Sequence, residues 1–245
     1  MLDFNNLPAK DKLYYLDTES GQAIYCCDNR EVLPLFPDKA FDLVLTDPPY
    51  NALNIGPNKR EYADTKMQLS ENEYRDFCSS WFNLSQPLTE RMVFTPGIAN
   101  THNYPQPKWE LCWHKPASVS FNRMGGFNAW EPIFVYGDTK KVRLGQDYLL
   151  FNTLNFIKGE ERNHPCPKSM SLWSYLVDIF AAIDNLILDP FLGSGTTAVA
   201  AKILGRKCIG IEISEKYCEI AAKRLSQSVM QLEIPKETIK TETML

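Results

Sequence analysis

The sequence TDPPY, at residues 46–50, places a carboxylate, a double-proline corner and an aromatic ring directly after the apolar run FDLVL. The carboxylate of Asp47 could accept hydrogen bonds from a bound molecule, and the ring of Tyr50 could stack on a flat one. Pro48 and Pro49 fix the backbone and remove two N–H donors, which favours a rigid set of acceptors. A surface turn explains this stretch equally well, so its function depends on what lies beside it in the fold.

A second chemical pattern lies near the other end of the chain, where an apolar run ends in Asp189 and the glycine-rich stretch PFLGSGTT follows. Gly193 and Gly195 let the backbone approach a ligand closely, and Glu212 ends the next apolar run. An acid at that position is suited to a ribose diol. These features predict a strand–helix–strand unit that binds a nucleoside.

More than one ligand type competes for this unit. A phosphate-binding P-loop needs Lys after its last glycine, whereas two threonines follow Gly195 here. A dinucleotide fingerprint fits better, because Gly193, Gly195 and Ala198 satisfy GxGxxA and Glu212 lies 17 residues past Gly195. An NAD-linked oxidoreductase therefore stays open at this point.

Short strands and amphipathic helices must position these residues. Seven apolar segments predict strands, several of them without polar alternation, as is typical of strands covered on both faces. They are 22–27, 41–46, 91–95, 109–114, 131–137, 186–189 and 207–213. Helices are predicted after the capping box of Ser70 and Glu73, over about 169–183, and after Ser214. The alternation predicts a doubly wound α/β domain.

Both ends of the chain are expected to contribute to one sheet. After Glu212 only one helix and a tail, with 231–245 at its end, are left, so the neighbouring strand must come from elsewhere. Segment 22–27 supplies it and ends before Asp28, an acid suited to a purine edge. Segment 41–46 then lies beside the glycine-rich strand at the topological switch point, where such sheets bind ligands. Asp47 is therefore expected to face the ligand.

Length and composition are those of a globular protein. The chain has 245 residues, of which 44% are hydrophobic and 23% charged, enough to bury a sizeable core. It lacks an apolar run long enough to cross a membrane and a signal-peptide pattern, so a cytoplasmic location is expected. Its seven cysteines are scattered without a CxxC pair, so neither a disulfide framework nor a metal site is predicted. The net charge of −4 argues against nucleic-acid binding by bulk electrostatics alone.

Three stretches in this order resemble the amino-group DNA methyltransferases that use S-adenosylmethionine, in the permuted β-type arrangement where DPPY precedes the glycine-rich motif. They are CCDNREVLPLFPDKAFDLVLTDPPY, NHPCPKSMSLWSYLV and DPFLGSGTTAVAAKILGRKCIGIEI. The resemblance covers most of the chain. It implies a single domain, 1–245, with the circularly permuted, Rossmann-like, mostly parallel seven-stranded sheet of these enzymes. It also implies S-adenosylhomocysteine as a product.

The resemblance implies a cofactor site as well. Glu212 would hold the ribose hydroxyls and Asp28 the adenine, while His164 and Lys168 would lie near the carboxylate end with Ser169 as a further donor. The family usually has Gln-Lys-Pro where this chain has Pro-Lys-Ser, which weakens the inference for Lys168. The other residues expected to line the cofactor are Asp47, Asp189, Phe191, Gly193, Ser194, Gly195, Thr196 and Ile213.

The chemistry of this family explains the opening residues. The lone pair of an exocyclic amino group is delocalised into the ring, so the nitrogen is a poor nucleophile. If Asp47 and the Pro48 carbonyl accept its two N–H bonds, the lone pair points at the sulfonium methyl and a direct displacement follows; Pro49 keeps these acceptors rigid. The base must first leave the duplex, and Tyr50 is expected to stack on it.

Several alternatives compete with this hypothesis. Adenine N6 is favoured as the target, and cytosine N4 is the main alternative. A cytosine-C5 enzyme would need Cys166 as nucleophile and would leave DPPY without a role. A nucleotide-sensing module and an NAD-dependent oxidoreductase also leave DPPY unexplained, and RNA or protein amides are less favoured acceptors than DNA.

Contacts to double-stranded DNA are expected from the middle of the chain, where residues 108–170 carry nine Lys or Arg against six Asp or Glu. A target-recognition insertion is predicted at 115–162. The residues expected to contact DNA are Arg60, Arg123, Lys140, Lys141 and Arg143. The insertion is short, so either the recognised site is brief or a homodimer shares the work. A cognate restriction endonuclease is a further candidate partner, and no membrane is expected.

Overall fold

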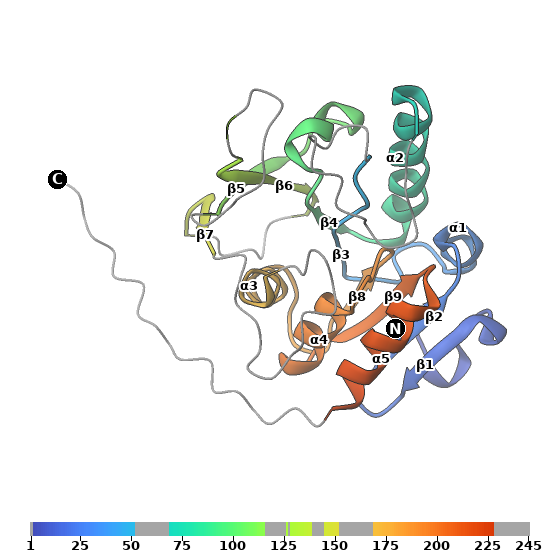
Figure 1. Cartoon of the computed structure of the whole chain (residues 1–245). Coiled ribbons are helices and arrows are strands. Elements are labelled where there is room, and N and C mark those ends of the chain that lie inside the picture. The colour runs from blue at the N-terminus through green and yellow to red at the C-terminus, as the bar shows by residue number, and fades with distance from the viewer. Residues whose placement is uncertain are drawn as a thin grey trace.

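A computed structural model shows how the two chemical patterns are arranged in space (Figure 1). It describes residues 2–51, 69–115, 126, 128–138, 145–151 and 169–227. The strands are β1 (Leu13–Asp17), β2 (Gln22–Cys26), β3 (Leu43–Thr46), β4 (Arg91–Phe94), β5 (Trp109–His114), β6 (Trp130–Gly137), β7 (Tyr148–Leu150), β8 (Leu186–Asp189) and β9 (Lys207–Glu212). The α-helices are α1 (Asn29–Val32), α2 (Glu71–Ser85), α3 (Met170–Phe180), α4 (Thr196–Ile203) and α5 (Glu215–Ser226). Short 3-10 turns complete the described part: η1 (Phe4–Asn6), η2 (Lys10–Lys12), η3 (Leu33–Leu35), η5 (Gln86–Leu88) and η6 (Ile98–Asn103).

The strands form one mixed sheet in the order β1-β2-β9-β8-β3-β4-β6-β5-β7. Strands β2, β9, β8, β3 and β4 are parallel neighbours, whereas β6 is antiparallel to both β4 and β5. The doubly wound α/β class is thereby confirmed, and all seven predicted strands are present.

The predicted strand number was wrong, because the described residues form nine strands instead of seven. The first addition, β1, is an edge strand that pairs with β2 through a tight hairpin turn. Its residues alternate between half-buried and exposed, so it lacks the continuous apolar run of the buried strands. The second addition, β7, has only three residues, too few to show a period.

The two chain ends contribute neighbouring strands to this sheet, as predicted. Strand β2, from the N-terminal end, pairs in parallel with β9 from the C-terminal end, and Cys26 lies opposite Glu212. Strand β3 pairs with β8 on one side and with β4 on the other. The DPPY stretch and the glycine-rich turn therefore follow adjacent parallel strands.

Helices cover both faces of the sheet, and each face has its own apolar core. Helices α3, α4 and α5 pack on one face with Leu176, Ala200 and Ala221 among the buried residues. Helix α2 packs on the other face through an aromatic cluster that includes Trp81 and Phe82. Figure 1 shows α2 on the opposite side of the sheet from α3 and α4.

The helix boundaries follow the sequence signals with one difference. Helix α2 opens on the predicted capping box of Ser70 and Glu73. Helix α3 ends at Phe180 instead of near residue 183, because Ala181 is extended and Asp184 turns the chain with a φ of 65°. No helix among the described residues has the length and apolar composition that a membrane span requires.

Candidate active site

The two chemical patterns meet at the carboxyl ends of β3 and β8. In register, Val44 on β3 lies opposite Leu188 on β8, so Asp47 and Asp189 leave the sheet at the same edge. The Thr46 hydroxyl donates a 2.6 Å hydrogen bond to Asp189 Oδ1, which ties the two strand ends together. This is the edge at which parallel α/β sheets bind ligands.

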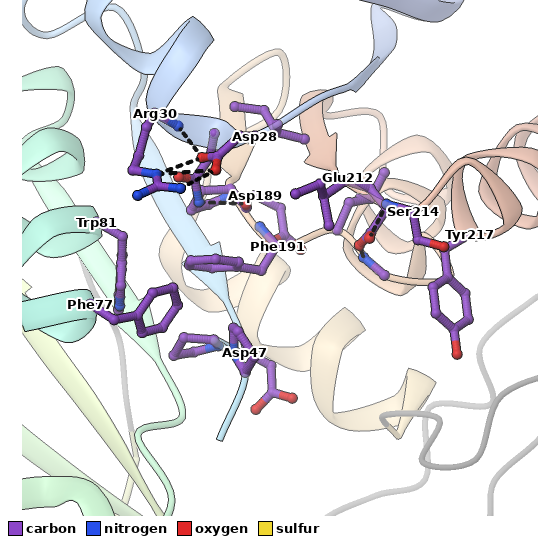
Figure 2. A pocket seen from close by; sticks show the side chains of 18 of the residues that line it. Asp28, Arg30, Asp47, Phe77, Trp81, Asp189, Phe191, Glu212, Ser214 and Tyr217 are labelled. Atoms are coloured by element: carbon purple, nitrogen blue, oxygen red, sulfur yellow. Dashed lines mark hydrogen bonds and ion pairs between the residues drawn. The ribbon is translucent and has the colours of Figure 1, made fainter. Parts of the chain in front are cut away.

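A cavity of about 740 Å³ opens at this edge. Its volume lies within the range of small-molecule sites, which is roughly 300–1,000 Å³. Figure 2 shows Phe191 between Asp28 and Asp47 in that view, with Glu212 to one side and the rings of Phe77 and Trp81 to the other. The predicted residues that line it are Asp28, Asp47, Pro48, Pro49, Tyr50, Asp189, Phe191, Gly193, Ser194, Thr196, Glu212 and Ile213.

Asp47 is held by hydroxyl groups. The Tyr50 hydroxyl donates a 2.7 Å hydrogen bond to Asp47 Oδ1, and the Thr95 hydroxyl donates to the same oxygen. Thr95 follows β4, and Asp47 follows the neighbouring strand β3. Burial raises the pKa of Tyr50 well above its ordinary value, and the Asp47 carboxylate acts in the same direction. The phenol therefore stays a proton donor, and the carboxylate orientation is fixed.

Asp189 is almost completely buried, with 2% of its surface exposed. It accepts hydrogen bonds from the Thr46 hydroxyl and, at 3.0 Å, from the Phe191 backbone N–H. Burial raises the pKa of Asp189 to about 6, while the hydrogen bonds of Thr197 and Thr46 oppose this shift. The Trp173 indole donates to Thr197 at 2.8 Å, so helices α3 and α4 join the same buried network.

Glu212 closes the cavity on the β9 side. Its Oε2 accepts the Gly193 backbone N–H at 2.8 Å, and its Oε1 accepts the Ser214 N–H at 2.9 Å. Burial raises the pKa of this carboxyl, and the backbone donors act against the shift. The carboxylate thus fixes the shape of the glycine-rich turn as well as facing the cavity.

Asp28 lies on the β2 side of the cavity. Its carboxylate accepts from the Arg30 N–H and pairs with the Arg30 guanidinium, so the pKa of Asp28 lies below its usual range. Asp28 is also the N-cap of the short helix α1. Both side chains line the cavity.

The two motif glycines have different roles. Gly193 has a φ of 55°, and a Cβ there would meet no atom within 4 Å, so the turn leaves open space beside the cavity. Gly195 has a φ of 85°, and a Cβ there would lie 2.8 Å from Ala221 Cβ on α5. Gly195 does not line the cavity among the described residues; it permits close packing of α4 against α5. Arg224 on α5 supports the turn by donating to the Ser194 carbonyl at 2.6 Å.

The family follows from comparison with known proteins. Residues 100–223, just over half of the chain, match a family model described as DNA methylase (N6_N4_Mtase). The chain belongs to this DNA methylase family. Members of the family are amino-group methyltransferases that use S-adenosylmethionine, so the oxidoreductase and nucleotide-sensing alternatives fall away.

Relatives extend this likeness over most of the chain. The Type II methyltransferase M.ScaI of Streptomyces caespitosus is 28% identical, covering 91% of this chain and 87% of the relative. The Type II methyltransferase M.HinfI of Haemophilus influenzae is 26% identical, covering 86% and 73%.

Solved structures of other DNA methylases share the fold. The M1.HpyAVI–SAM complex matches with a TM-score of 0.61 and 24% identity, over 84% of this chain and 99% of that one. The cytosine-N4-specific PvuII DNA methyltransferase matches with a TM-score of 0.63 and 19% identity, over 86% and 88%.

The cavity of this DNA methylase fits S-adenosylmethionine. Gly193 leaves room for a ligand that a side chain would fill, and Glu212 and Asp28 supply carboxylates at separate ends. Phe191 and Ile213 provide apolar surface between them. These groups match the hydroxyls, the amino group and the flat ring of a nucleoside.

Some predicted residues lie elsewhere. Ser169 is 1% exposed and caps α3, where its hydroxyl accepts the Leu172 N–H; it is not among the residues that line the cavity. The residues predicted at the cofactor's carboxylate end and at DNA that lie outside the described part of the chain are His164, Lys168, Arg60, Arg123, Lys140, Lys141 and Arg143. Cys166 and the tail 231–245 lie outside it too.

Other site residues were not predicted. Phe77 and Trp81 lie on the apolar side of α2, and both line the cavity and contact the Phe191 ring. Arg30 and Trp173 line it as well. Thr95 had a usable signal, because it ends the predicted strand 91–95 as Asp47 follows 41–46.

Proposed function

We propose that this chain methylates the exocyclic amino group of a base flipped out of double-stranded DNA, with adenine N6 as the favoured acceptor. The observation that supports this most is the shared cavity, in which Asp47 and Pro48 lie beside the glycine-rich turn and Glu212. The hydrogen-bond acceptors for the amine thus lie next to the site for the nucleoside.

The acceptors act on the amine. Asp47 and the Pro48 carbonyl accept its two N–H bonds, so that the nitrogen lone pair turns out of the ring plane. Thr95 and Tyr50 hold one Asp47 oxygen, which reduces the reorganisation that the carboxylate needs during reaction. Pro48 and Pro49 contribute no competing N–H donor.

A second group of residues binds the cofactor. S-adenosylmethionine, when bound, supplies an electrophilic methyl group. Glu212 accepts hydrogen bonds from the ribose hydroxyls and Asp28 from the adenine amino group, while Phe191 and Ile213 cover the apolar faces. His164 and Lys168 remain our proposal for the carboxylate end of the methionine, whereas the buried Ser169 caps α3.

Tyr50 has a second task in this proposal. Its ring stacks on the flipped base, an interaction worth roughly 1–3 kcal/mol, which offsets part of the cost of unstacking.

The basic residues Arg60, Arg123, Lys140, Lys141 and Arg143 contact the DNA. The relatives are named Type II methyltransferases, which supports a cytoplasmic enzyme with a cognate restriction endonuclease, and a homodimer would share recognition.

Nucleoside analysis tests the proposal. The protein is incubated with methyl-labelled S-adenosylmethionine and duplex DNA, and the digested nucleosides are identified by mass spectrometry. We expect N6-methyladenine at one short sequence. N4-methylcytosine would establish the alternative target, since cytosine presents the same amino group to Asp47. DNA that stays unmethylated with a folded, cofactor-binding protein would overturn the proposal.

A further inference from the structure

Five side chains with polar heads follow the active edge of the sheet on the face covered by α3 and α4. In strand order they are Asp189 on β8, Asp47 after β3, Thr95 after β4, Glu131 on β6 and Lys115 after β5. Each continues the alternation of buried core residues on its own strand, so all five lie on one face. Because β6 runs opposite to β4 and β5, its first residues share this edge with the carboxyl ends of the others.

The row connects the proposed amine site to an ion pair. Asp47 and Thr95 are hydrogen-bonded, and Lys115 Nζ pairs with Glu131 Oε1. The Tyr50 hydroxyl donates to the same Asp47 oxygen as Thr95. A Cβ on Gly97 would be 3.2 Å from the Tyr50 ring, and the Glu131 charge acts on the Tyr50 phenol. Glu131 and Lys115 therefore lie at the same edge and face of the sheet as Asp47, next to the cavity and not among the residues that line it.

The Lys115–Glu131 pair is unusually well shielded from water. Lys115 is 5% exposed, and its Nζ lies 4.9 Å from the centre of the Trp113 ring. The Glu131 side chain is 17% exposed. Taking both charges out of water is costly, and apolar side chains of similar size often stabilise a fold as well or better. Packing alone is therefore a poor explanation for this pair.

The distance across the sheet suits a nucleobase. Asp47 and Lys115 follow strands that are three positions apart, which is about 14 Å across a sheet, and Thr95 and Glu131 stand on the two strands between them. A flat base that lies above Thr95 and Glu131 would reach the carboxylate of Asp47 on one side and the ammonium of Lys115 on the other. One wall would present a carboxylate acceptor and the other an ammonium donor.

We propose that Lys115, positioned by Glu131, donates a hydrogen bond to the ring nitrogen beside the amino group of the target base. This inference rests on the proposed function and adds a group that recognises the base. Adenine N1 and cytosine N3 are both acceptors next to an amino group, whereas guanine N1 and thymine N3 carry hydrogen. An acceptor at Asp47 and a donor at Lys115 thus match the amino group and ring acceptor on the Watson–Crick edge of adenine or cytosine, whereas guanine and thymine present a carbonyl and an N–H in those places.

The test removes each partner of the proposed hydrogen bond in turn, first the ring nitrogen of the base and then the Lys115 ammonium. Once the methylated site has been mapped, the target base in a duplex is replaced by 1-deazaadenine or 3-deazacytosine, which lack the ring acceptor but keep the amino group. For the wild-type protein we expect kcat/KM to fall by about 10- to 100-fold on the analogue, the range of one hydrogen bond to a charged group. Lys115→Met should lose a similar factor on the natural base and no longer distinguish the two substrates.

Controls separate recognition from folding. Lys115→Met leaves Glu131 buried without its ion pair, so the double variant Lys115→Met/Glu131→Leu is measured beside it. Calorimetry with S-adenosylmethionine verifies that each variant is folded, and both should show equal activity on the natural base and the analogue. Glu131→Gln should keep part of the discrimination, because an amide oxygen still positions the ammonium.

The outcomes are distinct. A wild-type protein that methylates natural DNA and the deaza analogue equally well would overturn this inference and leave the proposed function standing. If Lys115→Met/Glu131→Leu still methylates the natural base faster than the deaza analogue, this would also overturn the inference. A folded protein that binds S-adenosylmethionine but methylates no DNA would overturn both.

Discussion

At the scale of single residues, the orientation of Asp47 depends on a neighbour outside the DPPY motif. Thr95 follows the adjacent parallel strand and donates to the same carboxylate oxygen as Tyr50. A carboxylate held in this way needs little reorganisation when an amine binds. Thr95 is thus a positioning residue, which the motif alone does not show.

Replacing Thr95 tests this role. Thr95→Val keeps the shape of the side chain and removes the hydroxyl, so kcat should fall by about 10-fold, the effect of one hydrogen bond. The affinity for S-adenosylmethionine, measured by calorimetry, should not change. Thr95→Ser restores the donor and should recover most of the turnover. Equal turnover for Thr95→Val and the wild type would show that the hydroxyl does not position Asp47.

Asp189 predicts a pH dependence of stability. Its carboxyl is buried, with a pKa of about 6 in the folded protein and an ordinary value of 3.8. Between pH 4 and pH 6 the folded state therefore holds a proton that the unfolded chain releases. The free energy of unfolding falls by about 3 kcal/mol over this window and is flat above it with respect to this group.

Denaturant unfolding at several pH values measures the contribution of Asp189 to the free energy of unfolding. The variant Asp189→Asn keeps the size of the side chain and cannot titrate, so it is the reference. The wild-type free energy of unfolding should drop relative to the variant from pH 4 to pH 6. A constant difference over that range would mean that Asp189 is already ionised in the folded state at pH 4.

At the scale of elements, the glycine-rich turn shows how far a motif can be interpreted. The pattern correctly predicted a strand, a tight turn and a small-residue helix, because local sequence determines each of them. It assigned both glycines to the ligand, whereas Gly195 is required by Ala221 on α5. That contact joins two helices and cannot be inferred from either one.

Alanine substitutions should separate these roles. Gly195→Ala forces a Cβ to 2.8 Å from Ala221 Cβ at a φ of 85°, so the free energy of unfolding should fall by about 1–3 kcal/mol. Gly193→Ala meets open space, so it should be less destabilising and should weaken binding of S-adenosylmethionine more. Thermal or denaturant unfolding and calorimetry measure the two effects. The reverse order of destabilisation would contradict the packing role of Gly195.

The strands that the sequence did not predict share a physical cause. Strand β1 is a hairpin partner on the sheet edge, and β7 has three residues that pair with β5. Such edge strands are stabilised by their neighbours and need no continuous apolar run. Most of the seven predicted strands are largely buried and carry that run, which is why the sequence was sufficient to predict them.

At the scale of the whole molecule, the adjacency of β2 with β9 and of β3 with β8 could be predicted from the number of strands left after Glu212. The row from Asp47 to Lys115 could not. Strand β6 lies between β4 and β5, out of sequence order, and this placement brings Glu131 to the active edge. Only the folded sheet shows that Glu131 and Lys115 lie at the same edge and face as Asp47.

The central claim is that two strand ends, far apart in sequence, form one site where Asp47 acts on the amine and the glycine-rich turn holds the cofactor. The variant Asp47→Ala tests it most directly, with the cofactor dissociation constant from calorimetry and methyl transfer to the mapped DNA site under single turnover. Asp42→Asn, at the other end of β3, is the control, because its amide oxygen can still accept the Leu186 N–H.

We predict that Asp47→Ala binds S-adenosylmethionine as the wild type does and transfers methyl groups at least about 1,000-fold more slowly, the upper range for loss of a preorganised polar group. The control should retain both activities. Methyl transfer by Asp47→Ala at the wild-type rate would contradict the account.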